Sequence, residues 1–146
     1  METKREGLVL VVDDDRNAVE ILYRMLQKEG FEVLRAHGGP QAIEIATAQP
    51  VDVILLDVMM PQMDGFQVCA VLRGQERTRD IPVILLTAKD DMETRARGMK
   101  LAVSEYLTKP VNKLELLPRV QAQVRARELE RRLSETAAAV AELVEK

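Results

Sequence analysis

The chain has 146 residues, a formal net charge of −3 and 31% charged residues, which is typical of one globular domain with a short appendage. Its single cysteine, Cys69, and single histidine, His37, exclude an intrachain disulfide and a zinc site built on several such residues. The sequence has no apolar run long enough to span a membrane, no basic stripe and no tryptophan. We therefore expect a cytoplasmic protein that does not itself bind nucleic acid.

Short apolar runs alternate with amphipathic segments along most of the chain. The runs predict strands at 8–12, 32–36, 54–56, 83–86 and 104–107, the last being the weakest. Helical periodicity of apolar residues lies between them, around 18–26, 42–46, 66–72 and 92–101. Glycines and prolines fall at the boundaries, where turns are expected. Five strand–helix units in this order predict a parallel sheet with helices on both faces.

Polar side chains follow four of the predicted strands. Asp13 and Asp14 come after the first strand, Asp57 after the third, Thr87 after the fourth and Lys109 after the fifth. The carboxyl ends of parallel strands meet at one edge of a sheet, so these groups are expected to converge. Carboxylates without an imidazole favour a hard cation such as Mg²⁺ or Mn²⁺. The ammonium and hydroxyl suit phosphoryl oxygens, so the set predicts phosphoryl transfer.

Four segments in order resemble the receiver domain of two-component response regulators: 10–15, 55–65, 82–88 and 106–110. The resemblance covers roughly residues 7–120, and its specificity comes from four segments that each lie at the end of a predicted strand. It implies an α/β fold of the flavodoxin-like class. The expected sheet is doubly wound and parallel, with five strands in the order 2-1-3-4-5.

The same resemblance implies roles for the site residues. Asp57 is expected to be the phosphoacceptor and a metal ligand. Asp14 is expected to bind the metal directly and Asp13 through a water, and the main-chain carbonyl of Met59 would be a further ligand. The implied cofactor is Mg²⁺ or Mn²⁺, and the implied phosphodonor is a sensor histidine kinase or a phosphotransfer protein.

Three further positions are implied to handle the phosphoryl group and the resulting switch. Lys109 is expected to contact the phosphoryl group, and the peptide bond between Lys109 and Pro110 is expected to be cis. Thr87 would hydrogen-bond the group, and Tyr106 would change rotamer together with Thr87. The switch would alter the face formed by the fourth helix, fifth strand and fifth helix. Such a protein catalyses only its own phosphorylation and dephosphorylation and is not an enzyme with an external substrate.

One stretch departs from the family pattern. The segment before Tyr106 usually carries a glycine, an alanine and an aspartate, whereas this chain has Ala102, Val103, Ser104 and Glu105. The missing glycine is expected to cost a favourable helix C-cap. The chemistry of the site does not depend on this stretch.

Beyond the receiver pattern, the helical signal continues to the end of the sequence. We expect a flexible N-terminus over 1–6, a receiver domain over 7–124 and a helical extension over 125–146. Apolar residues at about 3.5 spacing in the extension predict a coiled coil, either a homodimer or a linker to an output domain. The step from Val124 to Leu129 breaks the register and suggests a stutter. The alternatives are a solvated tail, or a homodimer through the fourth helix, fifth strand and fifth helix.

Other functions remain alternatives. An aspartyl-nucleophile phosphohydrolase commonly has a second aspartate two residues after the nucleophile, where this chain has Met59. A nucleotide-binding domain would need a glycine-rich loop after the first strand, where acidic residues stand instead. A receiver-like interaction module without phosphoryl chemistry would not need the complete set of acidic, hydroxyl and lysine residues.

Overall fold

The five predicted strands form one parallel sheet in the computed structural model, which describes residues 6–88 and 91–145. The spatial order is β2-β1-β3-β4-β5, as predicted. The expected flexible N-terminus lies almost entirely outside the described residues. The strand bounds are β1 Leu8–Val12, β2 Glu32–Ala36, β3 Val53–Asp57, β4 Val83–Thr87 and β5 Glu105–Thr108.

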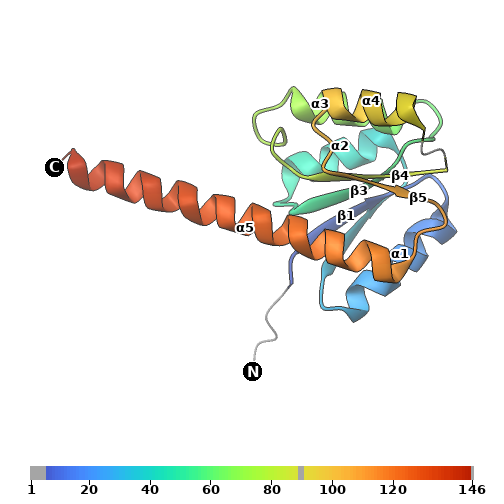
Figure 1. The fold of residues 1–146 in the computed structure, drawn as a ribbon, viewed down its shortest axis with the longest axis horizontal. Helices are drawn as coiled ribbons and strands as arrows, with labels where there is room; N and C mark the ends of the chain where they lie inside the picture. Colours follow the sequence, from blue (N-terminus) through green and yellow to red (C-terminus); the bar gives the residue numbers. More distant parts are fainter. Residues whose placement is uncertain (1–5, 89–90, 146) are drawn as a thin grey trace.

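Helices cover both faces of the sheet (Figure 1). Helices α2 (Gly39–Ala48), α3 (Gly65–Arg73) and α4 (Met92–Lys100) lie on one face. Helices α1 (Arg16–Lys28) and α5 (Lys113–Val144) lie on the other. Strands β3 and β4 are buried along their whole length and β1 from Val9 onward, so alternate side chains pack into two separate cores. In β1, for example, Leu10 packs in the core under α2 and α3, whereas Val11 packs in the core under α1 and α5.

Aspartate side chains cap the N-termini of three described helices, namely α1, α3 and α4. The Asp15 carboxylate accepts hydrogen bonds from the backbone N–H groups of Asn17 and Ala18 and caps α1. The Asp64 carboxylate accepts from the backbone of Gln67, whose side chain accepts from the backbone of Asp64 in return. This reciprocal capping box satisfies backbone donors that a helix N-terminus otherwise leaves free. The caps fix where these helices begin, and therefore fix the loops that precede them.

Helix α5 is continuous across Pro118 and leaves the domain in its second half (Figure 1). The step from Val124 to Leu129 is not the stutter within one seam that the sequence suggested. Val124 is buried against the sheet, whereas the Leu129 side chain is 58% exposed. Five residues turn an α-helix through about 500°, so the two side chains lie on different faces. No helix among the described residues is long and apolar enough to cross a membrane.

The segment that departs from the family pattern has a strained backbone. Ala102, at the position of the usual glycine, has a φ of 54°, in the left-handed region that disfavours residues with a β-carbon. The Arg73 guanidinium donates to the carbonyl of Leu101 at 2.8 Å and to that of Ala102 at 3.2 Å. These charge-assisted bonds hold the end of α4 in place although the favourable glycine is absent.

We predict that Ala102→Gly stabilises the domain by about 0.5–1 kcal/mol. Removing the β-carbon relieves the left-handed strain, which outweighs the extra chain entropy of glycine in the unfolded state. Urea denaturation measures the difference. The matched control is Ala122→Gly, at an exposed right-handed position in α5, which should lower stability by about 1 kcal/mol. Equal destabilisation by both changes would contradict the prediction.

Candidate functional site

Three carboxylates meet at the carboxyl edge of the sheet. Asp13 follows β1 and Asp57 ends β3, and these two strands are hydrogen-bonded neighbours. Both residues are buried, with 1% and 4% of their surface exposed, whereas the adjacent Asp14 is exposed. Carboxylate oxygens of the three residues lie within 4.8 Å of one another. The parallel topology therefore brings together acidic residues that are more than 40 positions apart in the sequence.

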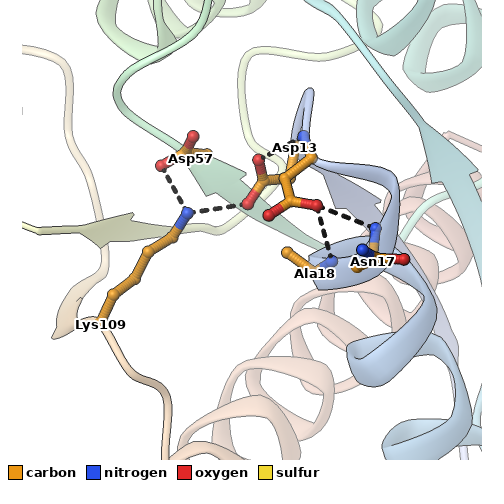
Figure 2. Close-up of polar contacts among 6 residues, drawn as sticks. Asp13, Asn17, Ala18, Asp57 and Lys109 are labelled. Atoms are coloured by element: carbon orange, nitrogen blue, oxygen red, sulfur yellow. Dashed lines mark hydrogen bonds and ion pairs between the residues drawn. The ribbon is translucent and has the colours of Figure 1, made fainter.

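Lys109 extends into this cluster from the loop after β5. Its ammonium nitrogen lies 2.8 Å from Oδ2 of Asp13 and 3.1 Å from Oδ1 of Asp57, and so bridges the two buried carboxylates (Figure 2). The backbone N–H of Lys109 donates to the carbonyl of Thr87 at 2.8 Å. The peptide bond between Lys109 and Pro110 is cis. The loop thus holds the lysine beside β4 with its side chain directed toward β1 and β3.

Burial and like charges shift the ionisation of the cluster. Burial raises the pKa of Asp57 to about 6, the hydrogen bond from Lys109 opposes the rise, and the negative charge of Asp13 adds to it. Burial alone would lower the pKa of Lys109. Hydrogen bonds and attraction to Asp13 and Asp57 outweigh this effect, so the pKa of Lys109 is raised. The lysine is therefore charged at neutral pH, while Asp57 is held in its ionised form at a free-energy cost.

The composition of the cluster fits a divalent cation. Among the described residues, three carboxylates face one ammonium, which leaves net negative charge in a partly buried site. All the available side-chain ligand atoms are oxygens, the type preferred by Mg²⁺ and Mn²⁺. Met59 lies two residues after Asp57, and its side chain is exposed. The role of its main-chain carbonyl as a further ligand stays a prediction.

Thr87 and Tyr106 occupy neighbouring strands on the side of α4. Thr87 ends β4 and is buried. The Tyr106 hydroxyl donates to the carbonyl of Arg95 in α4 at 2.9 Å, and the Arg95 guanidinium lies 5.5 Å from the centre of the ring. Gly98 of α4 is buried under this ring, and a β-carbon there would overlap the Tyr106 side chain. The tyrosine thus packs on α4.

Gly65 is a site residue whose role the sequence did not indicate. A β-carbon on Gly65 would lie 2.6 Å from the carbonyl oxygen of Asp57, closer than real β-carbons approach. The Gly65 N–H also donates to the carbonyl of Val58 at 2.9 Å. The first residue of α3 therefore packs directly against the backbone that carries Asp57. An aspartate followed by a glycine is locally typical only of a turn and a helix start, because the close approach of Gly65 to Asp57 is between segments and not local.

A hollow of about 490 Å³ opens beside the cluster, between α1 and the loop after β5. Asp13 and Lys109 lie at its polar side. Its other walls are mainly apolar and include Ile21, Met25 and Val111. Ile21 is 62% exposed, so its apolar side chain is accessible at the edge of the charged site. The site therefore has an apolar surface at its border.

We predict that Asp57→Asn stabilises the protein by about 1–3 kcal/mol at pH 8 in the presence of a chelator. The raised pKa of Asp57 means that the folded state binds its proton more tightly than the unfolded state, so ionisation above about pH 6 destabilises the fold. The amide removes this charge. The stabilisation should shrink as the pH falls through 6 and should vanish near pH 4, where the wild-type carboxyl is protonated.

Chemical denaturation of both proteins at pH 8, 6 and 4.5 measures this dependence. Asp64→Asn, which keeps a capping side chain, is the control and should show no comparable dependence on pH. A stabilisation by Asp57→Asn that is the same at every pH would contradict the assignment.

Comparison with known proteins agrees with this geometry. Residues 9–121 match the model of the response regulator receiver domain. The chain is 44% identical over 117 residues to the response regulator PleD of Caulobacter vibrioides, covering 80% of this chain and 26% of PleD. It is 42% identical over 122 residues to the response regulator MprA of Mycobacterium ulcerans, covering 84% of this chain and 52% of MprA.

A solved structure shows the same fold. The chemotaxis protein CheY4 of Vibrio cholerae superposes with a TM-score of 0.76 at 33% identity, covering 80% of this chain and 97% of CheY4. By contrast, the chain spans only about a quarter to a half of the length of the curated relatives named above. The family match, these relatives and the five-stranded order of the sheet lead to one conclusion: the chain belongs to the response regulator receiver domain family of two-component signalling.

Proposed function

We propose that the protein accepts a phosphoryl group on Asp57 from a sensor histidine kinase or a phosphotransfer protein, and that this reaction needs Mg²⁺ or Mn²⁺. The observation that carries the proposal is the bridge from the Lys109 ammonium to Asp13 and Asp57, within a cluster of three carboxylates. This arrangement provides a nucleophile, a cationic contact for the incoming group and oxygen ligands for a metal. Membership of the receiver family supports each role.

The proposed transfer uses Asp57 as the nucleophile. A carboxylate oxygen attacks the phosphorus of a phosphohistidine, a new P–O bond forms, and the P–N bond breaks with release of the imidazole, which takes up a proton. Asp57 needs no general base because it is ionised above a pKa of about 6. Lys109, already 3.1 Å from Asp57, balances the negative charge that arrives with the phosphoryl oxygens.

We assign the metal ligands as the family pattern implies. Asp14, Asp57 and the main-chain carbonyl of Met59 would bind the ion directly, and Asp13 would bind it through a water. The ion would supply charge neutralisation between the acidic cluster and the phosphoryl group. The protein would catalyse its own phosphorylation and the later hydrolysis, without turnover of an external substrate.

The apolar hollow supports docking of a protein donor next to Asp57. A donor that carries phosphohistidine must bring this side chain to a buried carboxylate, so it needs a contact surface at the edge of the site. Ile21, Met25 and Val111 offer such a surface, with Lys109 at its border. Apolar contact area of this kind stabilises association without competing for the charged groups.

The output of the switch is proposed to pass through Thr87 and Tyr106. Thr87 would hydrogen-bond the phosphoryl group and shift toward it, and Tyr106 would then give up its bond to the Arg95 carbonyl. Because Tyr106 packs over Gly98, this motion changes the face formed by α4, β5 and α5. Partners that contact this face would then distinguish the phosphorylated protein from the free one.

We predict that acetyl phosphate with Mg²⁺ adds one phosphoryl group, or about 80 Da, to the protein, and that Asp57→Asn abolishes the addition. Intact-mass spectrometry at neutral pH measures the product. Asp64→Asn, which removes a carboxylate outside the cluster, should leave incorporation unchanged. Lys109→Ala should lower the rate by at least about tenfold, since it removes the cationic contact. Undiminished incorporation in Asp57→Asn would refute the proposed phosphoacceptor.

We also predict a change at Tyr106 on activation. The chain has only two tyrosines, so fluorotyrosine labelling gives two ¹⁹F signals, from Tyr23 and Tyr106. Mg²⁺ with beryllofluoride, a phosphoryl mimic, should shift the Tyr106 signal and leave that of Tyr23 nearly unchanged. The shift should be absent in Asp57→Asn, and Tyr106→Phe assigns the signals. A shift that persists without Asp57 would separate Tyr106 from the proposed switch.

The hydrolase alternative lacks a group that it would need. Two residues after Asp57 stands the exposed side chain of Met59, which cannot act as an acid or a base. Steady turnover of a phosphomonoester in large excess over protein would be required to favour it. The acidic cluster likewise opposes a nucleotide-binding function, because three carboxylates repel a pyrophosphate.

A further inference from the structure

The part of α5 that projects from the domain carries an apolar stripe. Ten large apolar side chains are exposed among the described residues, and five of them lie on this projecting part. They are Leu129, Leu133, Val140, Leu143 and Val144, with exposures from 53% to 79%. Figure 1 shows the C-terminal end of this segment projecting beyond the sheet and the other helices. A solvated tail does not need such a concentration of leucine and valine along one helix.

Four residues of the stripe follow a regular heptad spacing together with Ala126 and Thr136, and Val144 lies at a flanking e position. Steps of three and four residues alternate from residue 126 to residue 143, the spacing of the a and d positions of a two-stranded coiled coil. The a positions are Ala126, Leu133 and Val140, and the d positions are Leu129, Thr136 and Leu143. All six are exposed. The heptad begins beside the domain at Ala126 and continues past it, so five layers from Leu129 onward, and Ala126 at the edge of the domain, are available to a partner helix.

The domain itself packs on a different face of α5. Val120 and Val124 are buried in the core, and two turns after Val124 the guanidinium of Arg131 lies 2.8 Å from Oδ1 of Asp52. The other carboxylate oxygen of Asp52 accepts from the backbone N–H of Leu8 at 2.8 Å, at the start of β1. In the heptad Val120 occupies a b position, and Val124 and Arg131 occupy f positions, which all lie on the outer side of the coil. The ion pair of Asp52 with Arg131 therefore fixes the rotation of the helix, so that the a and d residues from Leu129 onward lie on the face opposite the domain, whereas Ala126 borders a hollow that Arg73 and Pro82 also line.

Charges beside the seam favour one orientation of a partner helix. In a parallel dimer, a g residue lies opposite the e residue of the next heptad of the partner. This rule places Arg125 opposite Glu130 of a second copy, and the reciprocal pair forms at the same time. An antiparallel pairing of the same stripe, which sets residue 126 opposite 143, instead brings two copies of Arg132 together at its centre. Like charges at that position oppose the antiparallel form.

We propose that the exposed stripe of α5 binds a second copy of this chain as a parallel, in-register two-stranded coiled coil. The two receiver domains then lie at the same end of the coil, each on its outer face and each held in phase by Asp52 and Arg131. The domain supplies a preformed helix start, so the short seam does not bear the cost of helix nucleation. This dimer does not depend on phosphoryl transfer at Asp57, and the tests below therefore use no phosphodonor.

Sedimentation equilibrium of the full chain tests the association. We expect a dimer for the wild type and for Asp57→Asn. Leu133→Glu and Val140→Glu place charges in the seam and should each raise the dimer dissociation constant by about a hundredfold or more. The matched control is Ala138→Glu, at an outer f position, which should keep the dimer dissociation constant within about threefold of the wild-type value. A wild-type monomer at all accessible concentrations, or equal effects of all three glutamates, would overturn the proposal.

Disulfide formation tests the orientation. Residue 143 is a d position near the end of the seam. In a parallel dimer the two cysteines of Leu143→Cys, one from each chain, lie side by side and should form a disulfide on mild oxidation. In the antiparallel pairing the same cysteines would be about 25 Å apart. Glu142→Cys, at the outer c position, is the control and should cross-link far more slowly. Cys69 is buried and does not interfere. A dimer that fails to cross-link through residue 143 would overturn the parallel arrangement.

Charge reversal tests the register. Arg125→Glu alone and Glu130→Arg alone each create like-charge pairs and should weaken the dimer by about tenfold. The double variant restores opposite charges in the reciprocal positions and should recover the wild-type affinity to within about threefold. Circular dichroism and phosphorylation by acetyl phosphate report whether each variant keeps the receiver fold. Additive weakening in the double variant would exclude the proposed register.

Discussion

The bridge from the Lys109 ammonium to Asp13 and Asp57 is the interaction on which the site depends. Two buried carboxylates on neighbouring strands repel each other, and the lysine is the cation that lies between them. Burial still raises the pKa of Asp57 to about 6, so the site keeps net negative charge when Asp57 is ionised. The same imbalance that costs stability suits the divalent cation and the phosphoryl group that we propose for this site.

The rest of the fold holds this charge cluster in position. The central strands are buried on both faces, which makes their carboxyl ends rigid platforms for Asp13, Asp57 and Thr87. Gly65 allows α3 to approach the backbone of Asp57 closely, and the backbone bond from Lys109 to Thr87 ties the lysine loop to β4. On the far side of the sheet from α1, Tyr106 packs over Gly98 in α4. The site and the proposed output face are thus joined through two neighbouring strands.

Helix α5 packs on the domain with one face and carries the proposed dimer seam on another. One face contributes Val120 and Val124 to the core, and Arg131 extends the contact through its ion pair with Asp52. The other face carries the exposed heptad from residue 126 onward. Because one rigid helix bears both faces, a displacement of α5 at the sheet would reach the proposed coiled coil without any hinge. At the end of α4, a separate contact has a stabilising role: the Arg73 guanidinium donates to the carbonyls of Leu101 and Ala102 and so holds the strained Ala102 in place.

The sequence by itself determined the elements, the parallel order implied by the family resemblance and the set of residues at the strand ends. These features depend on local periodicity and on residues that directly follow strands. The sequence also predicted that Asp13, Asp57 and Lys109 converge, because parallel strands share one carboxyl edge. The distances of the lysine bridge, the raised pKa of Asp57 and the contact of Gly65 with its backbone depend instead on segments far apart in the chain. Helix rotation shows the difference best. Apolar spacing around Val124 and Leu129 suggested one seam with a stutter, but the tertiary structure buries one residue and exposes the other, because the sheet covers only one face of α5.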